Sequence, residues 1–115
     1  MSVPIRLSLP ADPGRLGVVR DVVGTAFAGD GRESEAWDDV AIAIDEVVLE
    51  LCSGAGVERL SLVIGDTSVE VEGTGVAPAW EPSPVVDRLI TRLAAVTVVA
   101  GDGVVRLRLA PMARS

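Results

Sequence analysis

Two glutamates, Glu46 and Glu50, are the residues whose spacing most directly suggests chemistry. They lie four residues apart in a segment with helical periodicity, so both carboxylates project from the same side of the predicted helix. Two neighbouring carboxylates can bind Mg²⁺, which prefers oxygen ligands, but they repel each other when no cation is present. The plainer interpretation is a solvated helix face that also carries Glu35 and Asp39.

Other kinds of catalytic or metal site are excluded by residue types that the chain lacks. The sequence contains no His, Lys, Asn, Gln or Tyr, and all ten basic residues are Arg. A Ser-His-Asp or Cys-His centre needs an imidazole, and a P-loop or a Schiff base needs a lysine. The single cysteine, Cys52, forms no internal disulfide and is too few for a structural zinc site. We expect it in the core or at a helix end.

The composition predicts one globular domain over residues 1–115. Hydrophobic residues make up 49% and charged residues 23%, which predicts a folded chain with a hydrophobic core. Seventeen acidic residues against ten basic ones give a net charge of -7, the wrong sign for binding nucleic acid or an anionic membrane. The sequence shows no signal peptide and no apolar run of membrane-spanning length, which predicts a cytoplasmic protein.

Three helices are expected to position these residues. Two begin at start signals, Asp12-Pro13 and Ser34, and the third covers residues 85–94. Gly29 closes the first helix. One face of the second helix repeats apolar residues at helical spacing and is expected to face the core: Trp37, Val40, Ala41, Ile44, Val47, Val48 and Leu51.

Period-two alternation and breaker residues predict the strands and the turns. Strands are expected at residues 5–9, 60–64, 68–72, 96–100 and 104–109. Turns are expected at 29–31 and 53–56, and one long loop at 73–84. The order β-α-α-β-β-α-β-β predicts an α+β two-layer sandwich. Its sheet is expected to be mixed and mostly antiparallel, with about five strands covered on one face by the three helices.

This order and several segments resemble the GHKL (Bergerat) ATPase fold, in the RsbW/SpoIIAB-like branch of anti-sigma factors and serine-protein kinases. The segments that carry the resemblance are the opening Leu7-Ser8-Leu9-Pro10-Ala11 with Leu16-Gly17-Val18-Val19-Arg20, then Asp39-Val40-Ala41-Ile42-Ala43-Ile44-Asp45-Glu46, Asp87-Arg88-Leu89-Ile90-Thr91-Arg92-Leu93 and Val104-Val105-Arg106-Leu107-Arg108-Leu109. The resemblance covers nearly the whole chain. It implies a bacterial, cytoplasmic regulator of transcription.

The family's catalytic helix carries a general-base Glu and, four residues later, an Asn that holds Mg²⁺ against the nucleotide phosphates. Glu46 matches the Glu, and the Asn position falls on Glu50. Because the chain contains no Asn or Gln, no shift of the alignment restores that amide. The resemblance therefore implies weakened nucleotide binding, with Glu50 as the remaining candidate metal ligand.

The next family motif is Asp-x-Gly-x-Gly, whose Asp reads the adenine amino group and whose glycines let backbone approach the ligand. Gly73 and Gly75 match the glycines, but Val71 stands at the Asp position and cannot accept a hydrogen bond. Glu72 is adjacent but points to the other face of the strand. A plain turn at the end of a strand is the alternative explanation for the two glycines.

The last family motif is a glycine-rich segment whose backbone N–H groups cradle phosphate before the final helix. Here those positions fall on Pro84 and Val86, and proline has no N–H. The loop before this helix is also too short for the mobile lid that the family folds over ATP.

Four further residues are candidates for binding a partner. Trp80 lies among prolines, where it is expected either to cover the vacated pocket or to join an interface. Arg88 and Arg92 are four residues apart on the third predicted helix, and they are either solvated or in contact with an acidic partner. Arg20 lies in the first helix, and the resemblance implies that residues 12–28 bind a sigma factor.

Taken with the resemblance, the damaged motifs favour a regulatory protein-binding module, a pseudo-kinase without bound cofactor. The expected partners are a sigma factor, a STAS-domain antagonist or a second copy in a homodimer. The alternative is an active protein serine kinase that uses ATP and Mg²⁺, with Glu46 as base and Glu50 as metal ligand. A third hypothesis is that the nucleotide pocket implied by the resemblance now holds a different small ligand.

Overall fold

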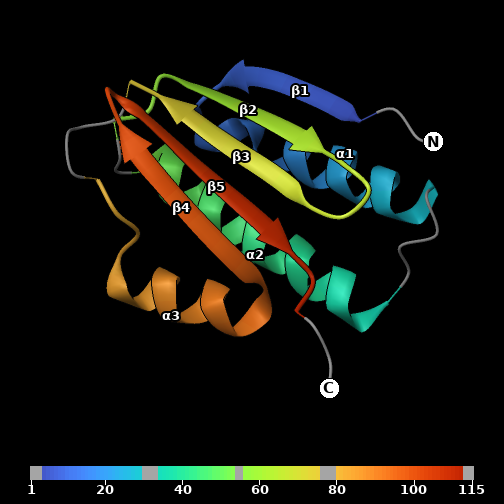
Figure 1. Cartoon of the computed structure of the whole chain (residues 1–115). Coiled ribbons are helices and arrows are strands. Elements are labelled where there is room, and N and C mark those ends of the chain that lie inside the picture. Colours follow the sequence, from blue (N-terminus) through green and yellow to red (C-terminus); the bar gives the residue numbers. More distant parts are fainter. Residues whose placement is uncertain (1–3, 30–33, 54–55, 76–79, 113–115) are drawn as a thin grey trace.

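A computed structural model describes residues 4–29, 34–53, 56–75 and 80–112. Three sequence predictions fall partly outside these ranges: the turn at Asp30 and Gly31, the helix-ending Gly54 and Ala55, and the part of the long loop at 76–79. Elsewhere the order of helices and strands is the predicted one (Figure 1). The elements are β1 (Ile5–Pro10), a 3-10 turn η1 (Pro13–Arg15), α1 (Leu16–Gly29), α2 (Glu35–Ser53), β2 (Arg59–Ile64), β3 (Val69–Thr74), α3 (Pro84–Leu93), β4 (Ala95–Gly101) and β5 (Val104–Ala110).

The strands form one sheet in the order β1-β2-β3-β5-β4. All four neighbouring pairs are antiparallel, so the sheet is more regular than the mixed sheet expected. The register follows the alternation of the sequence: Leu7 pairs with Leu62, Leu62 with Val71 and Val71 with Leu107. Because successive side chains point to opposite faces, this register gathers the apolar residues on one side of the sheet.

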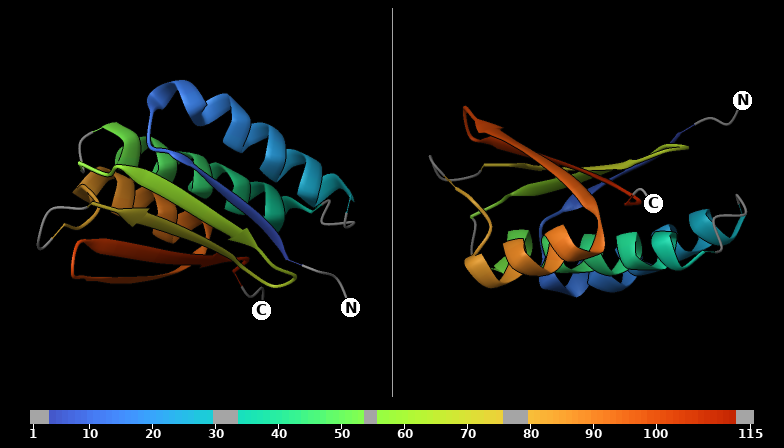
Figure 2. Two further views of the ribbon diagram at one scale, coloured as in Figure 1. Left: turned by 90° about the horizontal axis from the view of Figure 1, so that it is seen from above. Right: turned by 60° about the horizontal axis from the view of Figure 1, so that its bottom comes forward.

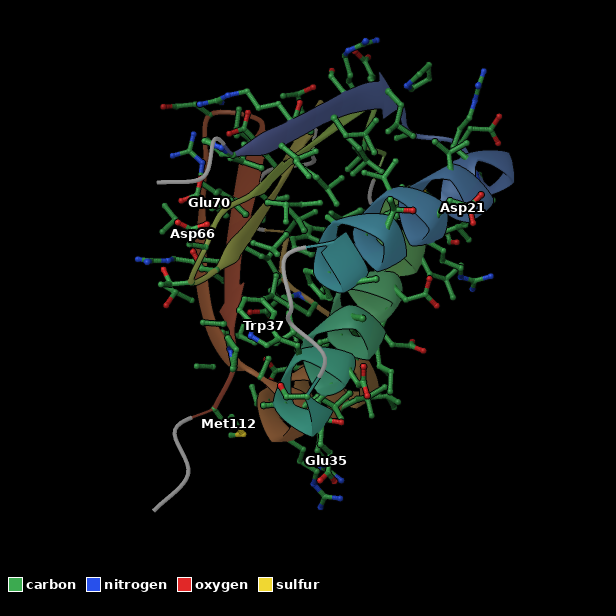
Figure 3. The ribbon with its side chains drawn as sticks, turned by 90° about the vertical axis from the view of Figure 1, so that its right-hand side faces the viewer. Asp21, Glu35, Trp37, Asp66, Glu70 and Met112 are labelled. Carbon is green, nitrogen blue, oxygen red and sulfur yellow. The ribbon has the colours of Figure 1, made fainter. Side chains whose placement is uncertain are left out.

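The three helices cover that apolar side as a second layer, with α2 between α1 and α3 (Figure 2). The predicted stripe of α2 is buried at Val40, Ile44, Val47, Val48 and Leu51, while Trp37 and Ala41 are half-buried. In Figure 3, Trp37 lies between the helices and the sheet, whereas Asp21 and Glu70 point outward from the two layers. The Trp37 ring meets Phe27 of α1 edge-on, with 5.0 Å between ring centroids, so α1 and α2 share one core.

Helices start at the two predicted signals, Asp12-Pro13 and Ser34, where the Ser34 hydroxyl accepts from the Trp37 N–H at 3.3 Å; the cap of α3 was not predicted. The Asp12 side chain accepts a hydrogen bond from the Gly14 N–H and begins η1, which leads into α1. Ser83 caps α3, because its hydroxyl accepts from the Val86 N–H and Pro84 occupies the first turn. In both cases a short polar side chain pairs a backbone donor that the helix itself leaves free, and proline fixes φ without losing a bond.

The long loop starts later than the sequence predicts, because β3 continues to Thr74. Gly73 pairs with Leu60 on one side and with Val105 on the other. The hydrogen bonds between β2 and β3 also extend one residue before the start of β2, because the Glu58 N–H donates to the Thr74 carbonyl at 2.8 Å. Two neighbouring strands therefore hold the glycine in the sheet, and this overrides its weak intrinsic preference for strands.

No helix of the described residues covers the other face of the sheet (Figure 2). Glu72 of β3 and Arg106 of β5 lie opposite each other there and form an ion pair at 2.7 Å. This hydrogen-bonded contact raises the pKa of Arg106. At the edge of the sheet, β4 contains no charged residue, and its Val98 and Val99 are 39% and 64% exposed.

No helix in the described ranges is both long and apolar enough to cross a membrane.

Candidate functional site

The two glutamates at the predicted site have different surroundings, although they lie one turn apart on α2. The Glu50 carboxylate accepts a hydrogen bond from the Ser83 backbone N–H at 3.0 Å, and this contact is partly buried. The Glu46 carboxylate is half-buried and has no hydrogen-bond or ion-pair partner among the residues that the structure describes. Glu50 therefore has a structural role, which sequence alone did not indicate.

The partner of Glu50 is the residue that begins α3. Ser83 is the N-cap of α3, and the Ser83 carbonyl accepts a hydrogen bond from the Asp87 N–H at 2.8 Å. The Ser83 N–H has no partner within the helix and donates to Glu50 instead. The N-terminal end of a helix carries a partial positive charge that favours an anion. A carboxylate of α2 thus supplies the anion at the end of α3 where the GHKL resemblance places nucleotide phosphates.

The two glycines are packed against other parts of the chain. A Cβ atom on Gly73 would lie 3.1 Å from Val57 and 3.5 Å from Val105, so side chains already fill the space beside it. Gly75 has φ +85°, and a Cβ there would lie 2.9 Å from the Glu58 Cγ. The backbone conformation at Gly75 therefore favours glycine, whereas a side chain at Gly73 would need the Val57 side chain to shift by a few tenths of an ångström.

The position that would read adenine lies in the core. Val71 is fully buried, and its neighbours in the register are Leu62 and Leu107. Trp80 is half-buried and packs against the hydrophobic core. Cys52 is half-buried near the end of α2, and burial raises the pKa of its thiol, with a smaller contribution from Asp12.

The three arginines predicted to bind a partner differ in their contacts. Arg20 of α1 forms a two-pronged ion pair with Asp45 of α2, at 2.6 and 2.9 Å, and this hydrogen-bonded contact raises the pKa of Arg20. Arg88 and Arg92 on α3 are exposed, and neither has an ion-pair partner within the described ranges. The Asp45 partner lies 25 residues from Arg20, so no local pattern indicated it.

Four hollows in the surface lie away from the two glutamates. They lie between α1 and α2, along α3, beside β1 and α1, and at the start of α2, and none of the four is lined by Glu46, Glu50, Gly73 or Gly75. Within the described ranges, no three Cys, Asp or Glu side chains come together as a metal site would require. The four hollows therefore provide no ligand site at the two glutamates.

Comparison with known proteins gives a match in structure and none in sequence. No model of a known protein family matches the chain, and no curated protein sequence matches it. The structure is similar to the crystal structure of the RsbU and RsbW domains of Rv1364c from Mycobacterium tuberculosis, with a TM-score of 0.70 and 16% sequence identity. The chain has an RsbW-like fold. The similarity covers 94% of this chain and 32% of that one, so the chain spans about a third of the length of its structural neighbour.

The residues at the positions that the GHKL resemblance assigns to nucleotide and Mg²⁺ lack the groups that it requires there. The oxygen that would bind the metal belongs to Glu50, which is hydrogen-bonded to Ser83. Val71 offers no acceptor for adenine, and Pro84 offers no N–H for phosphate. The missing acceptor at Val71 and the missing donor at Pro84 are visible in the sequence. The contact between Glu50 and Ser83 joins residues 33 positions apart and is visible only in the structure.

Proposed function

We propose that the chain is an anti-sigma-like regulator that acts by binding other proteins and has lost ATP binding and kinase activity. The observation that carries the proposal is the Glu50 carboxylate at the start of α3. An incoming triphosphate would meet a negative charge and a backbone donor that is already paired. Both effects oppose phosphate binding, because like charges repel and displacing a partly buried hydrogen bond costs free energy.

The RsbW-like fold supports the regulatory part of the proposal, and an anti-sigma role makes a sigma factor or a STAS-domain protein the expected partner. Homodimer formation, a bacterial source and a cytoplasmic location belong to the same proposal. The proposed loss of nucleotide chemistry is supported by the burial of Val71 in the core and by the hydrogen bond between Glu50 and Ser83.

Isothermal titration of the whole chain with Mg-ATP tests the loss of nucleotide binding. We expect no binding heat up to millimolar nucleotide. Micromolar binding that is abolished by Glu46→Ala or by Glu50→Ala would instead support the active serine kinase. The matched control is Glu70→Ala, which removes a glutamate from the opposite face of the sheet and should leave the titration unchanged.

Partner binding needs a separate measurement. The purified chain is titrated with sigma factors and STAS-domain proteins encoded in the source genome, and complexes are detected by light scattering. A stoichiometric complex without nucleotide supports the proposal. A complex that forms only with Mg-ATP contradicts it.

A further inference from the structure

The outward side of α3 carries apolar and basic residues in one stripe. Val85, Arg88, Leu89 and Arg92 follow the spacing i, i+3, i+4 and i+7, which places them along the same side of the helix. Val85 is 77% exposed and Leu89 is 36% exposed. Together with Pro84 these four residues line a surface hollow of about 290 Å³. We call these five residues the α3 stripe.

The fold of the chain does not account for the α3 stripe. The helix anchors itself through other residues, because Ile90 is fully buried and Val86 and Leu93 pack against the core. Figure 2 shows α3 at the margin of the helix layer, where α2 flanks it on one side only. Large apolar side chains exposed next to each other on a surface mark an interaction site more often than isolated ones do.

The charges of the α3 stripe contrast with those of the rest of the chain. The net charge of the protein is -7, and α2 alone contains six acidic residues and no basic one. Arg88 and Arg92 lack an ion-pair partner among the described residues, whereas Arg20 and Arg106 each have one. The acidic residue of α3, Asp87, falls at a different helical angle from the stripe.

We propose that the α3 stripe is a docking surface for an acidic helical segment of a partner protein. That segment carries apolar residues at helical spacing. Apolar side chains of that segment would pack on Val85 and Leu89, and its carboxylates would pair with Arg88 and Arg92. The ten residues of α3 extend over about 15 Å, so a partner helix of two to three turns matches the stripe. This proposal deepens the proposed function, because it assigns partner binding to one surface.

A display library of random 16-residue peptides, selected on the whole folded chain, tests the α3 stripe without a known partner. The same library is selected on Arg88→Glu/Arg92→Glu and on a matched control, Arg6→Glu/Arg59→Glu, which reverses two exposed arginines on strands β1 and β2. We expect the selected peptides to be acidic, with Leu, Ile, Val or Phe every three or four residues. Their affinity should fall at least tenfold on the α3 variant and stay unchanged on the control.

Three results would overturn the α3 proposal. The first is enriched peptides that are neutral or basic, or that bind the α3 variant as well as the original chain. The second is no enrichment at all. The third is a dimer of the chain, seen by light scattering, that Arg88→Glu/Arg92→Glu dissociates, because the occupant is then a second copy.

Failure of the α3 proposal is distinguishable from failure of the proposed function. A nucleotide-free complex with a sigma factor or a STAS-domain protein that survives Arg88→Glu/Arg92→Glu leaves the function intact and removes only the α3 stripe. Binding of Mg-ATP tests the function and does not involve these arginines. Arg88→Lys/Arg92→Lys keeps both charges and should retain peptide affinity within about threefold; a tenfold loss would contradict recognition through charge.

Discussion

Two regions that meet at α3 have opposite characters. At the N-terminal end of the helix, where the GHKL resemblance places a nucleotide, the polar and flexible positions are engaged within the chain: Glu50 binds Ser83, Gly73 packs on Val57, and Gly75 packs on Glu58. Along the outward side of the same helix, Arg88 and Arg92 have no ion-pair partner among the described residues, and Val85 and Leu89 are 77% and 36% exposed.

Under the two proposals, the fold keeps its shape while its binding surface changes place. Buried polar groups must be paired, so a vacated ligand site is stable only when other residues of the chain replace the ligand's contacts. Exposed charges carry no such requirement, because water solvates them. This difference is the physical basis for proposing that the nucleotide site is closed and that the α3 stripe is open to a partner.

The largest expected effect comes from returning the family's adenine-reading residue to the closed region. Val71→Asp places a carboxylate in the core between Leu62 and Leu107, so we expect it to lower the free energy of unfolding by about 3 kcal/mol or more. Urea unfolding measures the loss, with Glu70→Asp on the opposite face as control. A stable Val71→Asp variant that binds ATP would mean that the pocket is open.

Gly75→Ala should have the next largest effect. Alanine is disfavoured at φ +85°, and its Cβ would meet the Glu58 side chain, so we expect a loss of about 1 to 2 kcal/mol. Gly24→Ala is a control of opposite sign: it lies within α1 with no atom near its Cβ, and should stabilise the chain by about 0.5 to 1 kcal/mol. Thermal unfolding of both variants gives the comparison, and equal effects would contradict the close packing of Gly75.

Glu50→Gln should cost about 1 kcal/mol, because the amide oxygen still accepts from Ser83 but the favourable charge at the start of α3 is lost. Glu46→Gln is the matched control one turn earlier and should change the stability by less than about 0.5 kcal/mol. Denaturant unfolding at low salt measures both. Equal losses at the two positions would show that Glu50 has no special role.

The smallest expected effect is on the open surface. Arg88→Ala/Arg92→Ala removes two side chains that contact no charged partner in the described part of the chain, so the free energy of unfolding should change by less than about 0.5 kcal/mol. The measurement is again urea unfolding. A loss above about 1 kcal/mol would show that the arginines stabilise the domain itself.

Local signals in the sequence predicted most of the fold. The Asp12 and Ser34 caps, the apolar stripe of α2 and the two hairpins all form as expected, because each depends on residues a few positions apart. The predicted end of β3 was two residues too early, because pairing with β2 and β5 holds Gly73 and Thr74 in the sheet. A propensity cannot anticipate pairing with a distant strand.

The candidate site was predictable only in part. The absence of an acceptor at Val71 and of a donor at Pro84 is visible in the sequence. The contacts that replace the ligand are not, because Glu50 and Ser83 lie 33 residues apart, and the Arg20–Asp45 ion pair spans 25 residues between two helices. Such pairs depend on how the helices pack, which no single-sequence pattern encodes.

The exposed edge of the sheet leads us to expect a solubility that depends on salt. Strand β4 offers an unpaired backbone edge without charge or proline, the kind of edge on which strands of other molecules assemble. The net charge of -7 keeps copies apart through mutual repulsion. That repulsion reaches about 10 Å at 0.1 M salt and about 3 Å at 1 M. Concentrated salt therefore removes the barrier to edge-to-edge association while leaving the fold of each molecule unchanged.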